Sequence, residues 1–264
     1  MSPRMDSGAR ARIALGPSRK VPTTPMQLDP PPRLVPDPRA PLFRITRDAV
    51  TKSVRLLPSS RTALELPLEE GNYYQGQVAV FREHLVPLCC APTLTRGRLA
   101  LLDGPPGGGK TYLARALLHA AQVPFVRTDP ATFLALTEDD LASLAATLSG
   151  PKVLFIEDAD PVIQQRTEET HGTLANLLNL GDGMLGLETD WRVVMTTNMA
   201  YDEVDTAVKR NGRMGARVHC STLVAPLADA VHKRLTGGKP LPALRAMMLA
   251  EVYATAMRTG MVPR

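Results

Sequence analysis

Residues Gly104 to Thr111 read Gly-Pro-Pro-Gly-Gly-Gly-Lys-Thr, and this stretch decides the fold. It fits the pattern G-x-x-x-x-G-K-[ST] at every fixed position. The apolar run Leu99 to Asp103 precedes it, and apolar residues recur at helical spacing from Thr111 to Gln122. A strand, a loop and a helix in this order predict a phosphate-binding loop, in which backbone N–H groups and a helix N-terminus face one anion. The alternative is an ordinary Gly/Pro-rich turn before a helix, which the complete pattern and its flanks disfavour.

The loop residues have separate roles in binding a nucleotide. Glycines allow the tight turn, Lys110 is expected to reach the β and γ phosphates, and Thr111 is expected to ligate Mg²⁺. We therefore predict that ATP and Mg²⁺ bind at the loop and at the residue after it. These residues are Gly104, Pro105, Pro106, Gly107, Gly108, Gly109, Lys110, Thr111 and Tyr112.

A second apolar run, Lys152 to Ile156, ends in the acidic stretch Glu157-Asp158-Ala159-Asp160. A buried strand can hold carboxylates at its carboxyl end beside the phosphate loop, where one assists the metal and the next activates the attacking water. We predict the metal-assisting role for Glu157, together with Thr111, and the role of base for Asp158. A solvated acidic turn is the alternative.

The two segments resemble the Walker A and Walker B motifs of an AAA+ ATPase. The resemblance covers about residues 76 to 226 and includes Arg192 to Asn198, which is similar to the family's sensor 1 strand. This resemblance implies that the Asn198 amide holds the lytic water. It also implies a homo-oligomeric ring, with a hexamer as the expected size.

Two arginines carry the ring prediction. Residues Asp205 to Arg213 resemble the family's segment that ends in arginines spaced i, i+3, here Arg210 and Arg213, which in that family cross to the neighbouring subunit's γ-phosphate. Because Arg213 follows the Asn211-Gly212 turn, we expect it beyond a helix end, at the rim of the domain. The alternative for each arginine is a structural role at a helix C-terminus.

One departure from the family concerns the base. Most members read Asp-Glu where this chain reads Glu157-Asp158. The same inversion occurs in the branch of the mitochondrial AAA translocase that moves a folded Rieske protein, and Leu174 to Gly183 also resembles that branch. An aspartate is shorter than a glutamate by one C–C bond, about 1.5 Å. Either the water lies closer or hydrolysis is slow, so a nucleotide switch stays an open alternative.

Composition indicates a soluble globular enzyme. Of the 264 residues, 44% are hydrophobic and 22% are charged, which is ordinary for such proteins. No apolar run approaches the ~20 residues that span a bilayer, and no signal-peptide core is found, so we expect a cytoplasmic chain without a membrane partner. The cysteines lack metal spacing and suit a reducing compartment, and we interpret all five histidines as structural or solvated.

Charge is concentrated near the N-terminus. Residues 1–60 hold 11 Lys and Arg against 4 Asp and Glu, and 11 of the 24 prolines. We predict that residues 1–40 are a disordered, basic, proline-rich tail. Such a tail can contact nucleic acid, hook a neighbouring subunit or only keep the chain soluble.

The remaining residues divide into three parts. We predict an N-terminal β extension over residues 41–75, a nucleotide-binding domain over 76–226 and a short helical lid over 227–264. The expected strands of the extension are Leu42 to Ile45, Val54 to Leu57 and Ala63 to Leu66, and the expected lid helices are Leu227 to Leu235 and Leu241 to Arg258.

Further local signals predict single helices, strands and helix starts within these parts. We predict a helix over Gln75 to Cys90, a strand over Pro124 to Thr128, and helix starts at Asp129-Pro130 and at Thr137 with Asp140. Two side chains keep two interpretations each. Phe133 is either a pore-loop aromatic or a core residue, and Arg245 is either a residue of the family's sensor 2 type or a solvated helix arginine.

The motifs together predict an α/β P-loop fold with a mostly parallel sheet flanked by helices, an N-terminal extension and a small helical C-terminal lid. The expected function is ATP hydrolysis in a ring that remodels or translocates a protein client. A different class of function is the alternative, namely a nucleotide-switched, DNA-associated assembly factor with slow or no hydrolysis.

Overall fold

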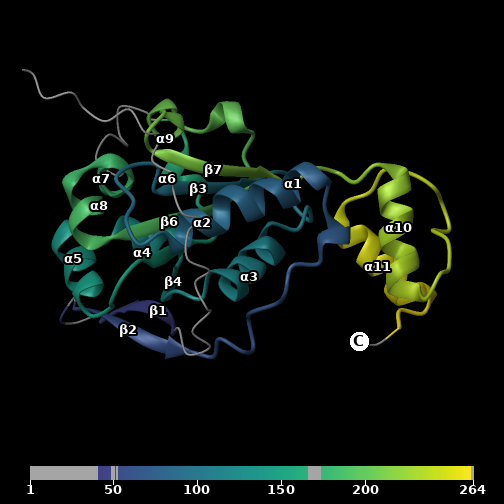
Figure 1. Ribbon diagram of the computed structural model, residues 1–264, viewed down its shortest axis with the longest axis horizontal. Coiled ribbons are helices and arrows are strands. Elements are labelled where there is room, and N and C mark those ends of the chain that lie inside the picture. The colour runs from purple at the N-terminus through teal and green to yellow at the C-terminus, as the bar shows by residue number, and fades with distance from the viewer. Residues whose placement is uncertain (1–40, 49–50, 52, 166–173, 263–264) are drawn as a thin grey trace, which may run out of the picture. The chain divides into compact units, whose positions relative to one another are not determined.

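A seven-stranded sheet lies at the centre of the described residues (Figure 1). The computed structural model describes residues 41–48, 51, 53–165 and 174–262, so the tail predicted over residues 1–40 lies outside it. The strand order is β2-β1-β4-β5-β6-β3-β7, and every neighbouring pair is parallel except β1 with β2. The strands are β1 (Leu42–Arg47), β2 (Val54–Ser59), β3 (Leu99–Asp103), β4 (Phe125–Thr128), β5 (Lys152–Ile156), β6 (Trp191–Thr197) and β7 (Met214–His219).

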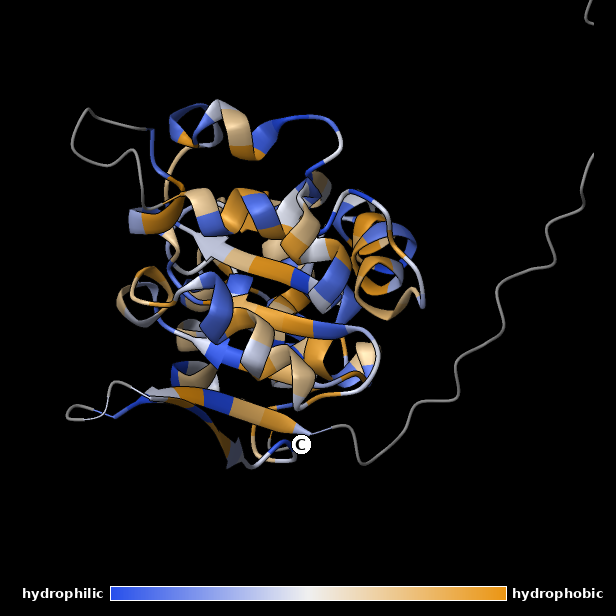
Figure 2. Ribbon diagram, turned by 90° about the vertical axis from the view of Figure 1, so that its left-hand side faces the viewer, coloured by the Kyte–Doolittle hydropathy of each residue, from blue (hydrophilic) through white to orange (hydrophobic). Residues whose placement is uncertain are grey.

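The central strands form because their side chains are buried on both faces of the sheet. Every residue of β3, β5 and β6 is buried, as the continuous apolar runs predict for a parallel sheet covered on both sides. In β3, Leu99 and Leu101 enter one core cluster, whereas Ala100 and Leu102 enter the other. Figure 2 shows these strands as hydrophobic bands between the helices. The predicted α/β fold with a mostly parallel sheet is confirmed.

Helices pack on both faces of this sheet (Figure 1). One core cluster takes in α3, α10 and α11, and the other takes in α5 and α7. The helices are α1 (Gln75–Val80), η2 (Phe81–Leu85), α2 (Val86–Cys90), α3 (Lys110–Ala121), α4 (Pro130–Leu134), α5 (Glu138–Ala146), α6 (Asp160–Ile163), α7 (Ala175–Asp182), α8 (Met184–Thr189), α9 (Thr206–Lys209), α10 (Ala225–Thr236) and α11 (Leu249–Thr259), with short 3-10 turns η1 (Glu70–Asn72) and η4 (Tyr201–Glu203). Within the described residues, no helix is both long and apolar enough to span a bilayer.

Helix starts follow the predicted capping residues. The Asp129 carboxylate accepts a hydrogen bond from the Thr132 N–H at 2.8 Å, and Pro130 is the first residue of α4. Thr137 and Asp140 form a reciprocal capping box at the start of α5, with bonds of 3.1 and 3.0 Å. Both predictions are confirmed.

The helix predicted over residues 75–90 contains a π-helical segment, η2. The Val86 N–H reaches the carbonyl of Phe81, five residues earlier, instead of the usual fourth. Pro87 follows directly, and a proline ring inside a helix crowds the carbonyl four residues before it. The wider turn accommodates that ring, so the helix continues to Cys90.

Two predicted elements are wrong in the N-terminal and C-terminal parts. Residues 63–66 form no strand, because the Leu64 and Glu65 N–H groups bond locally to the Arg61 carbonyl. The last helix begins at Leu249 and not at Leu241. The preceding backbone is engaged elsewhere, since Met247 pairs with Leu223 through bonds of 2.9 and 3.0 Å.

The hairpin of β1 and β2 continues the central sheet. Leu42 to Arg44 of β1 pair in parallel with Phe125 to Arg127 of β4. The N-terminal β residues thereby extend the nucleotide-binding sheet at the edge away from β3 and β7.

Candidate nucleotide-binding site

The phosphate loop connects β3 to α3, as its sequence pattern predicts. It passes so close to Cys220 that only glycine fits at two positions. A Cβ atom at Gly104, where φ is +131°, would overlap the carbonyl oxygen of Cys220, and one at Gly108 would lie 2.7 Å from the same oxygen. The loop backbone is therefore held tightly against the end of β7.

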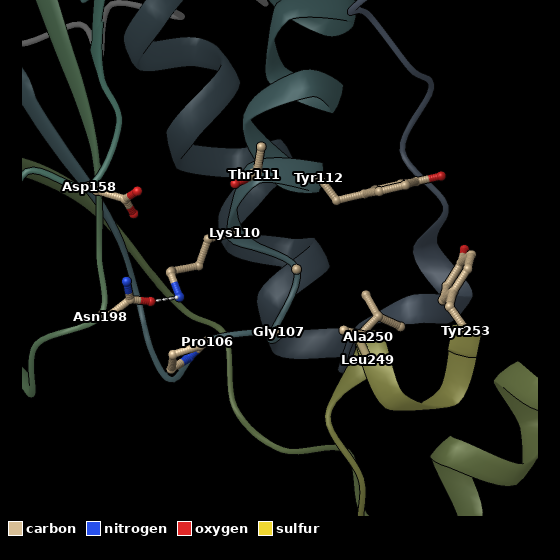
Figure 3. A pocket seen from close by; sticks show the side chains of 11 residues that line it. Pro106, Gly107, Lys110, Thr111, Tyr112, Asp158, Asn198, Leu249, Ala250 and Tyr253 are labelled. Carbon is tan, nitrogen blue, oxygen red and sulfur yellow. Dashed lines mark hydrogen bonds between the residues drawn. The ribbon is translucent and has the colours of Figure 1, made fainter. Parts of the chain in front are cut away.

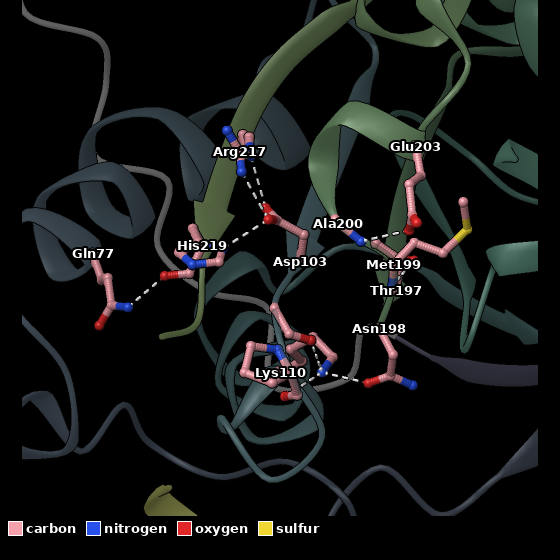
Figure 4. Close-up of polar contacts among 12 residues, drawn as sticks. Gln77, Asp103, Lys110, Thr197, Asn198, Met199, Ala200, Glu203, Arg217 and His219 are labelled. Atoms are coloured by element: carbon pink, nitrogen blue, oxygen red, sulfur yellow. Dashed lines mark hydrogen bonds and ion pairs between the residues drawn. The ribbon is translucent and has the colours of Figure 1, made fainter. Parts of the chain in front are cut away.

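Lys110, the first residue of α3, points back into its own loop. Its ammonium donates to the carbonyls of Gly104 at 2.7 Å and Pro105 at 2.9 Å, and to Oδ1 of Asn198 at 2.7 Å (Figures 3 and 4). Only 7% of the residue is exposed. Burial lowers the pKa of Lys110, whereas neighbouring acidic groups, Asp158 among them, act in the opposite direction. An ammonium with three donors so placed can transfer them to phosphate oxygens.

A cavity of about 390 Å³ lies over the loop, within the size range of small-ligand pockets. Its two ends differ in chemistry (Figure 3). Lys110, Thr111, Asp158 and Asn198 line one end, and Tyr112, Leu249, Ala250 and Tyr253 line the other. The polar end suits phosphates and the aromatic end suits a nucleoside.

The start of α11 forms the aromatic end together with the residue after the loop. The Ala250 N–H donates to the carbonyl of Gly107 at 3.0 Å, which joins the lid to the phosphate loop. At Gly109 of the same loop, the hydroxyl of buried Tyr73 donates to the backbone carbonyl at 3.1 Å. Burial raises the pKa of Tyr73 above its ordinary value, so the phenol keeps its proton.

The acidic pair after β5 separates into two directions. Asp158 lines the cavity, in a left-handed backbone conformation with φ +52°, and its N–H donates to the Thr196 hydroxyl at 2.8 Å. Glu157 lies beside the loop helix, where Oε1 is 3.4 Å from the Thr111 hydroxyl, and its Oε2 is 4.0 Å from Arg127. The Thr111 hydroxyl and the Glu157 carboxylate next to it are oxygen donors, the ligand type that Mg²⁺ prefers.

Asn198 directly follows β6, and β6 lies between β5 and β3 in the sheet. Its position depends on Asp160, whose Oδ1 accepts the Asn198 N–H at 3.2 Å and also the Thr197 hydroxyl. In the sequence, Asp160 belongs to the acidic stretch after β5 and had no predicted role. The available signal was its position as the third acid after one buried strand.

A buried carboxylate at the entrance to the loop was missed by sequence analysis. Asp103, 1% exposed, accepts two hydrogen bonds of 2.8 Å from Arg217 and lies 2.8 Å from Nδ1 of His219 (Figure 4). The Arg217 guanidinium also lies over the Tyr201 ring, 3.6 Å from its centroid. The hydrogen bonds that Arg217 donates to Asp103 raise the pKa of Arg217. The sequence did contain a signal for this cluster. It consists of two basic residues two positions apart on β7 and an acidic residue at the end of an apolar strand.

The structure separates the two predicted arginines. Arg213 is held within its own chain, because Nε bonds to Asp182 at 2.7 Å and Nη1 donates to the Ala207 carbonyl at 3.0 Å. Its side chain is 16% exposed and lies beyond the end of α9, as predicted, and the role predicted for it at a neighbouring subunit stays a prediction. Arg210 is exposed at the end of α9 and makes no ion pair or side-chain hydrogen bond with any described residue. Neither arginine lines the cavity over the loop.

The structure shows where Phe133 and Arg245 lie, the two side chains for which the sequence allowed two interpretations each. Phe133 is 1% exposed and lies in the core with Leu141 and Ile163, so the pore-loop interpretation is wrong. Arg245 lies in the segment before α11, with a 58% exposed side chain 3.5 Å from Glu251. It does not line the cavity, and it belongs to no helix, although both interpretations placed it at the start of the last one.

Similarity to known proteins agrees with this geometry. The sequence profile of the ATPase family associated with various cellular activities (AAA) matches residues 100–222. The chain contains an AAA ATPase domain. The matched segment of this AAA domain includes the phosphate loop, the acidic pair, Asn198 and both arginines, whereas the β1–β2 hairpin and the lid helices lie outside it.

Relatives of the AAA domain include a proteasome regulatory subunit and an ATP-dependent zinc metalloprotease. The 26S proteasome regulatory subunit 6B homolog of Dictyostelium discoideum is 32% identical over 189 residues, which cover 66% of this chain and 41% of that protein. The ATP-dependent zinc metalloprotease FtsH of Karelsulcia muelleri is 36% identical over 128 residues, which cover 43% of this chain and 20% of that protein. The chain thus spans about two fifths or less of the length of these relatives.

Proposed function

We propose that the AAA domain binds ATP with Mg²⁺ and hydrolyses the bond between its β and γ phosphates, with ADP and inorganic phosphate as products. The observation that carries this proposal is the convergence of Lys110, Asp158 and Asn198 on one end of a single cavity. Thr111 and Glu157 would hold the metal, which supplies charge neutralisation at the β and γ phosphates. The nucleoside would occupy the end lined by Tyr112 and Tyr253.

Asn198 and Asp158 have separate roles in the proposed hydrolysis. Phosphate oxygens compete for the Lys110 ammonium, so Asn198 exchanges that hydrogen bond for one to the attacking water. Asp158 faces the same space and accepts the proton of that water. Its left-handed backbone turns the carboxylate into the cavity, which compensates in part for the shorter side chain.

Arg210 is our candidate for the residue that completes the site from a neighbouring copy in a ring, with a hexamer as the proposed size. Its exposure at the end of α9 and its lack of a described partner support this role, whereas Arg213 is occupied by Asp182. A guanidinium that approaches the γ-phosphate compensates the charge that develops in the transition state.

We propose that ATP hydrolysis drives the remodelling or translocation of a protein client. The names of the relatives, a proteasome regulatory subunit and an ATP-dependent metalloprotease, support this class of target. Assignment to the Rieske-protein translocase branch rests on the sequence motifs alone, chiefly the order Glu157-Asp158. The DNA-associated alternative rests on the basic residues 1–40, which lie outside the described residues.

Stimulated hydrolysis distinguishes the two classes of function. Phosphate release by the full chain is measured alone, with reduced and carboxymethylated α-lactalbumin as an unfolded polypeptide, and with a DNA duplex. We expect hydrolysis that the polypeptide stimulates. Absence of ATP binding contradicts the proposal as a whole, and salt-sensitive binding to the duplex without polypeptide stimulation supports the DNA-associated alternative.

A further inference from the structure

Three consecutive residues, Asn72, Tyr73 and Tyr74, contact three different parts of the nucleotide apparatus. Tyr73 reaches the phosphate loop at Gly109, as described above. The Tyr74 hydroxyl accepts the Val224 N–H and donates to the Thr222 carbonyl, both at 2.8 Å, and so holds the connection between β7 and α10. Asn72, the last residue of η1, faces the lid helices.

The Asn72 amide bridges the two lid helices from a fully buried position. Its Nδ2 donates to the Tyr253 hydroxyl of α11 at 3.1 Å, and its Oδ1 accepts a hydrogen bond from the Arg234 guanidinium of α10. Arg234 also bonds to Glu69 at 2.7 Å, and a Cβ atom at Gly71 would lie 3.3 Å from Arg234 Nε. The segment before α1 therefore fits closely around α10 and α11.

The position of Tyr253 matters because α11 closes the cavity. Leu249, Ala250 and Tyr253 line its aromatic end, and the Ala250 N–H holds the start of the helix to Gly107. One turn further along, the hydrogen bond from Asn72 defines where the Tyr253 ring lies. Asn72 itself does not line the cavity.

We propose that Asn72 is a positioning residue that holds α11 over the phosphate loop and so sets the affinity for nucleotide. This inference rests on the proposed binding of ATP. Asn72 acts through Tyr253 and Arg234 and makes no contact with the bound nucleotide. Replacement of Asn72 by an apolar residue leaves the Tyr253 hydroxyl and the Arg234 guanidinium without the amide as a hydrogen-bond partner. The lid then shifts away from Gly107.

Titration calorimetry with ADP tests the proposal in the full chain. We expect Asn72→Leu, which keeps the branching at Cγ and removes both bonds, to weaken ADP binding about three- to tenfold. Tyr253→Phe keeps the ring and removes one bond, and should weaken ADP binding in the same direction. Because both changes break the same Asn72–Tyr253 bond, the double variant should bind ADP about as Asn72→Leu does.

A matched control separates positioning from a general loss of stability. Asn176 donates to the Leu136 carbonyl at 2.7 Å in the other core cluster, away from the lid. Asn176→Leu should lower the melting temperature and leave ADP affinity unchanged. In steady-state hydrolysis, Tyr253→Phe should raise KM for ATP with little change in kcat, which a stability effect alone does not produce.

Each outcome bears on the proposal. Wild-type affinity in folded Asn72→Leu, or additive losses in the double variant, would overturn it while leaving the proposed function intact. If Asn72→Leu fails to fold, the Tyr253→Phe titration decides, and unchanged ADP affinity overturns the proposal. If the wild-type chain binds neither ADP nor ATP, the proposed function and this inference fail together.

Discussion

The ammonium of Lys110 lies 2.7 Å from Oδ1 of Asn198 and thereby joins the first residue of α3 to the residue after β6. The loop carbonyls of Gly104 and Pro105 complete its set of acceptors. Nucleotide phosphates must compete with these three groups for the same donors. Binding of the nucleotide and release of the Asn198 amide are therefore coupled.

Replacement of Lys110 is expected to remove nucleotide binding. Lys110→Ala deletes the only cation among the residues that line the described cavity, and leaves the phosphates facing Asp158 without compensation. Calorimetry with ATP and Mg²⁺ measures the loss, and Arg55→Ala, at an exposed cation of β2, is the control. Undiminished affinity and turnover in Lys110→Ala would contradict the assignment of the loop.

The two acidic residues after β5 are expected to respond differently. Asp158→Asn should bind ATP with Mg²⁺ and stop hydrolysis, because an amide does not accept a proton at neutral pH. Glu157→Gln should weaken the part of ATP binding that depends on Mg²⁺, since Glu157 lies beside the Thr111 hydroxyl. Affinity with and without Mg²⁺ is compared with phosphate release. Normal turnover in Asp158→Asn together with an inactive but normally binding Glu157→Gln would reverse the two roles.

The arginines are expected to separate catalysis from stability. Arg210→Ala should bind ATP, fold normally and lose hydrolysis by about 10³-fold or more, as removal of a trans-acting arginine does. Arg213→Ala should instead lower the free energy of unfolding by about 1–3 kcal/mol, because Asp182 and the Ala207 carbonyl lose a charged partner. Urea unfolding and phosphate release measure both effects.

A mixture of two inactive variants tests whether the site is shared. In mixed assemblies of Arg210→Ala and Lys110→Ala, some interfaces pair an intact loop with an intact Arg210. Partial recovery of hydrolysis is the expected result. A mixture that stays inactive although the two variants co-purify would show that Arg210 does not act across the interface.

The ion pair between buried Asp103 and partly exposed Arg217 at the loop entrance is expected to contribute to stability. Asp103→Asn removes the negative charge that faces Arg217 and His219, and should lower the free energy of unfolding by about 2–4 kcal/mol. In the double variant with Arg217→Met, the second change should cost little, because its partner is already neutral. Urea unfolding of the four proteins checks this, and fully additive losses would mean that Asp103 and Arg217 do not interact energetically.

Local chemistry in the sequence was sufficient for the phosphate loop, the buried strands and the helix caps. Gly104 to Thr111 specify their own backbone, and Lys152 to Ile156 read as a buried strand because every residue is apolar or has an apolar stem. Asp129 and Thr137 bond to N–H groups three residues away. Such interactions depend on near neighbours in the chain, so their pattern is visible in the sequence.

Only the tertiary structure decided which distant side chains meet. Phe133 had two interpretations in the sequence, and the core that encloses it decided between them. The contact of Arg213 with the Asp182 carboxylate had no signal in the sequence. Asn72 meets Tyr253 across 181 positions of the chain. Burial and pairing of this kind depend on how the helices and the sheet pack together, because an isolated segment carries no record of the neighbour that will satisfy its polar groups.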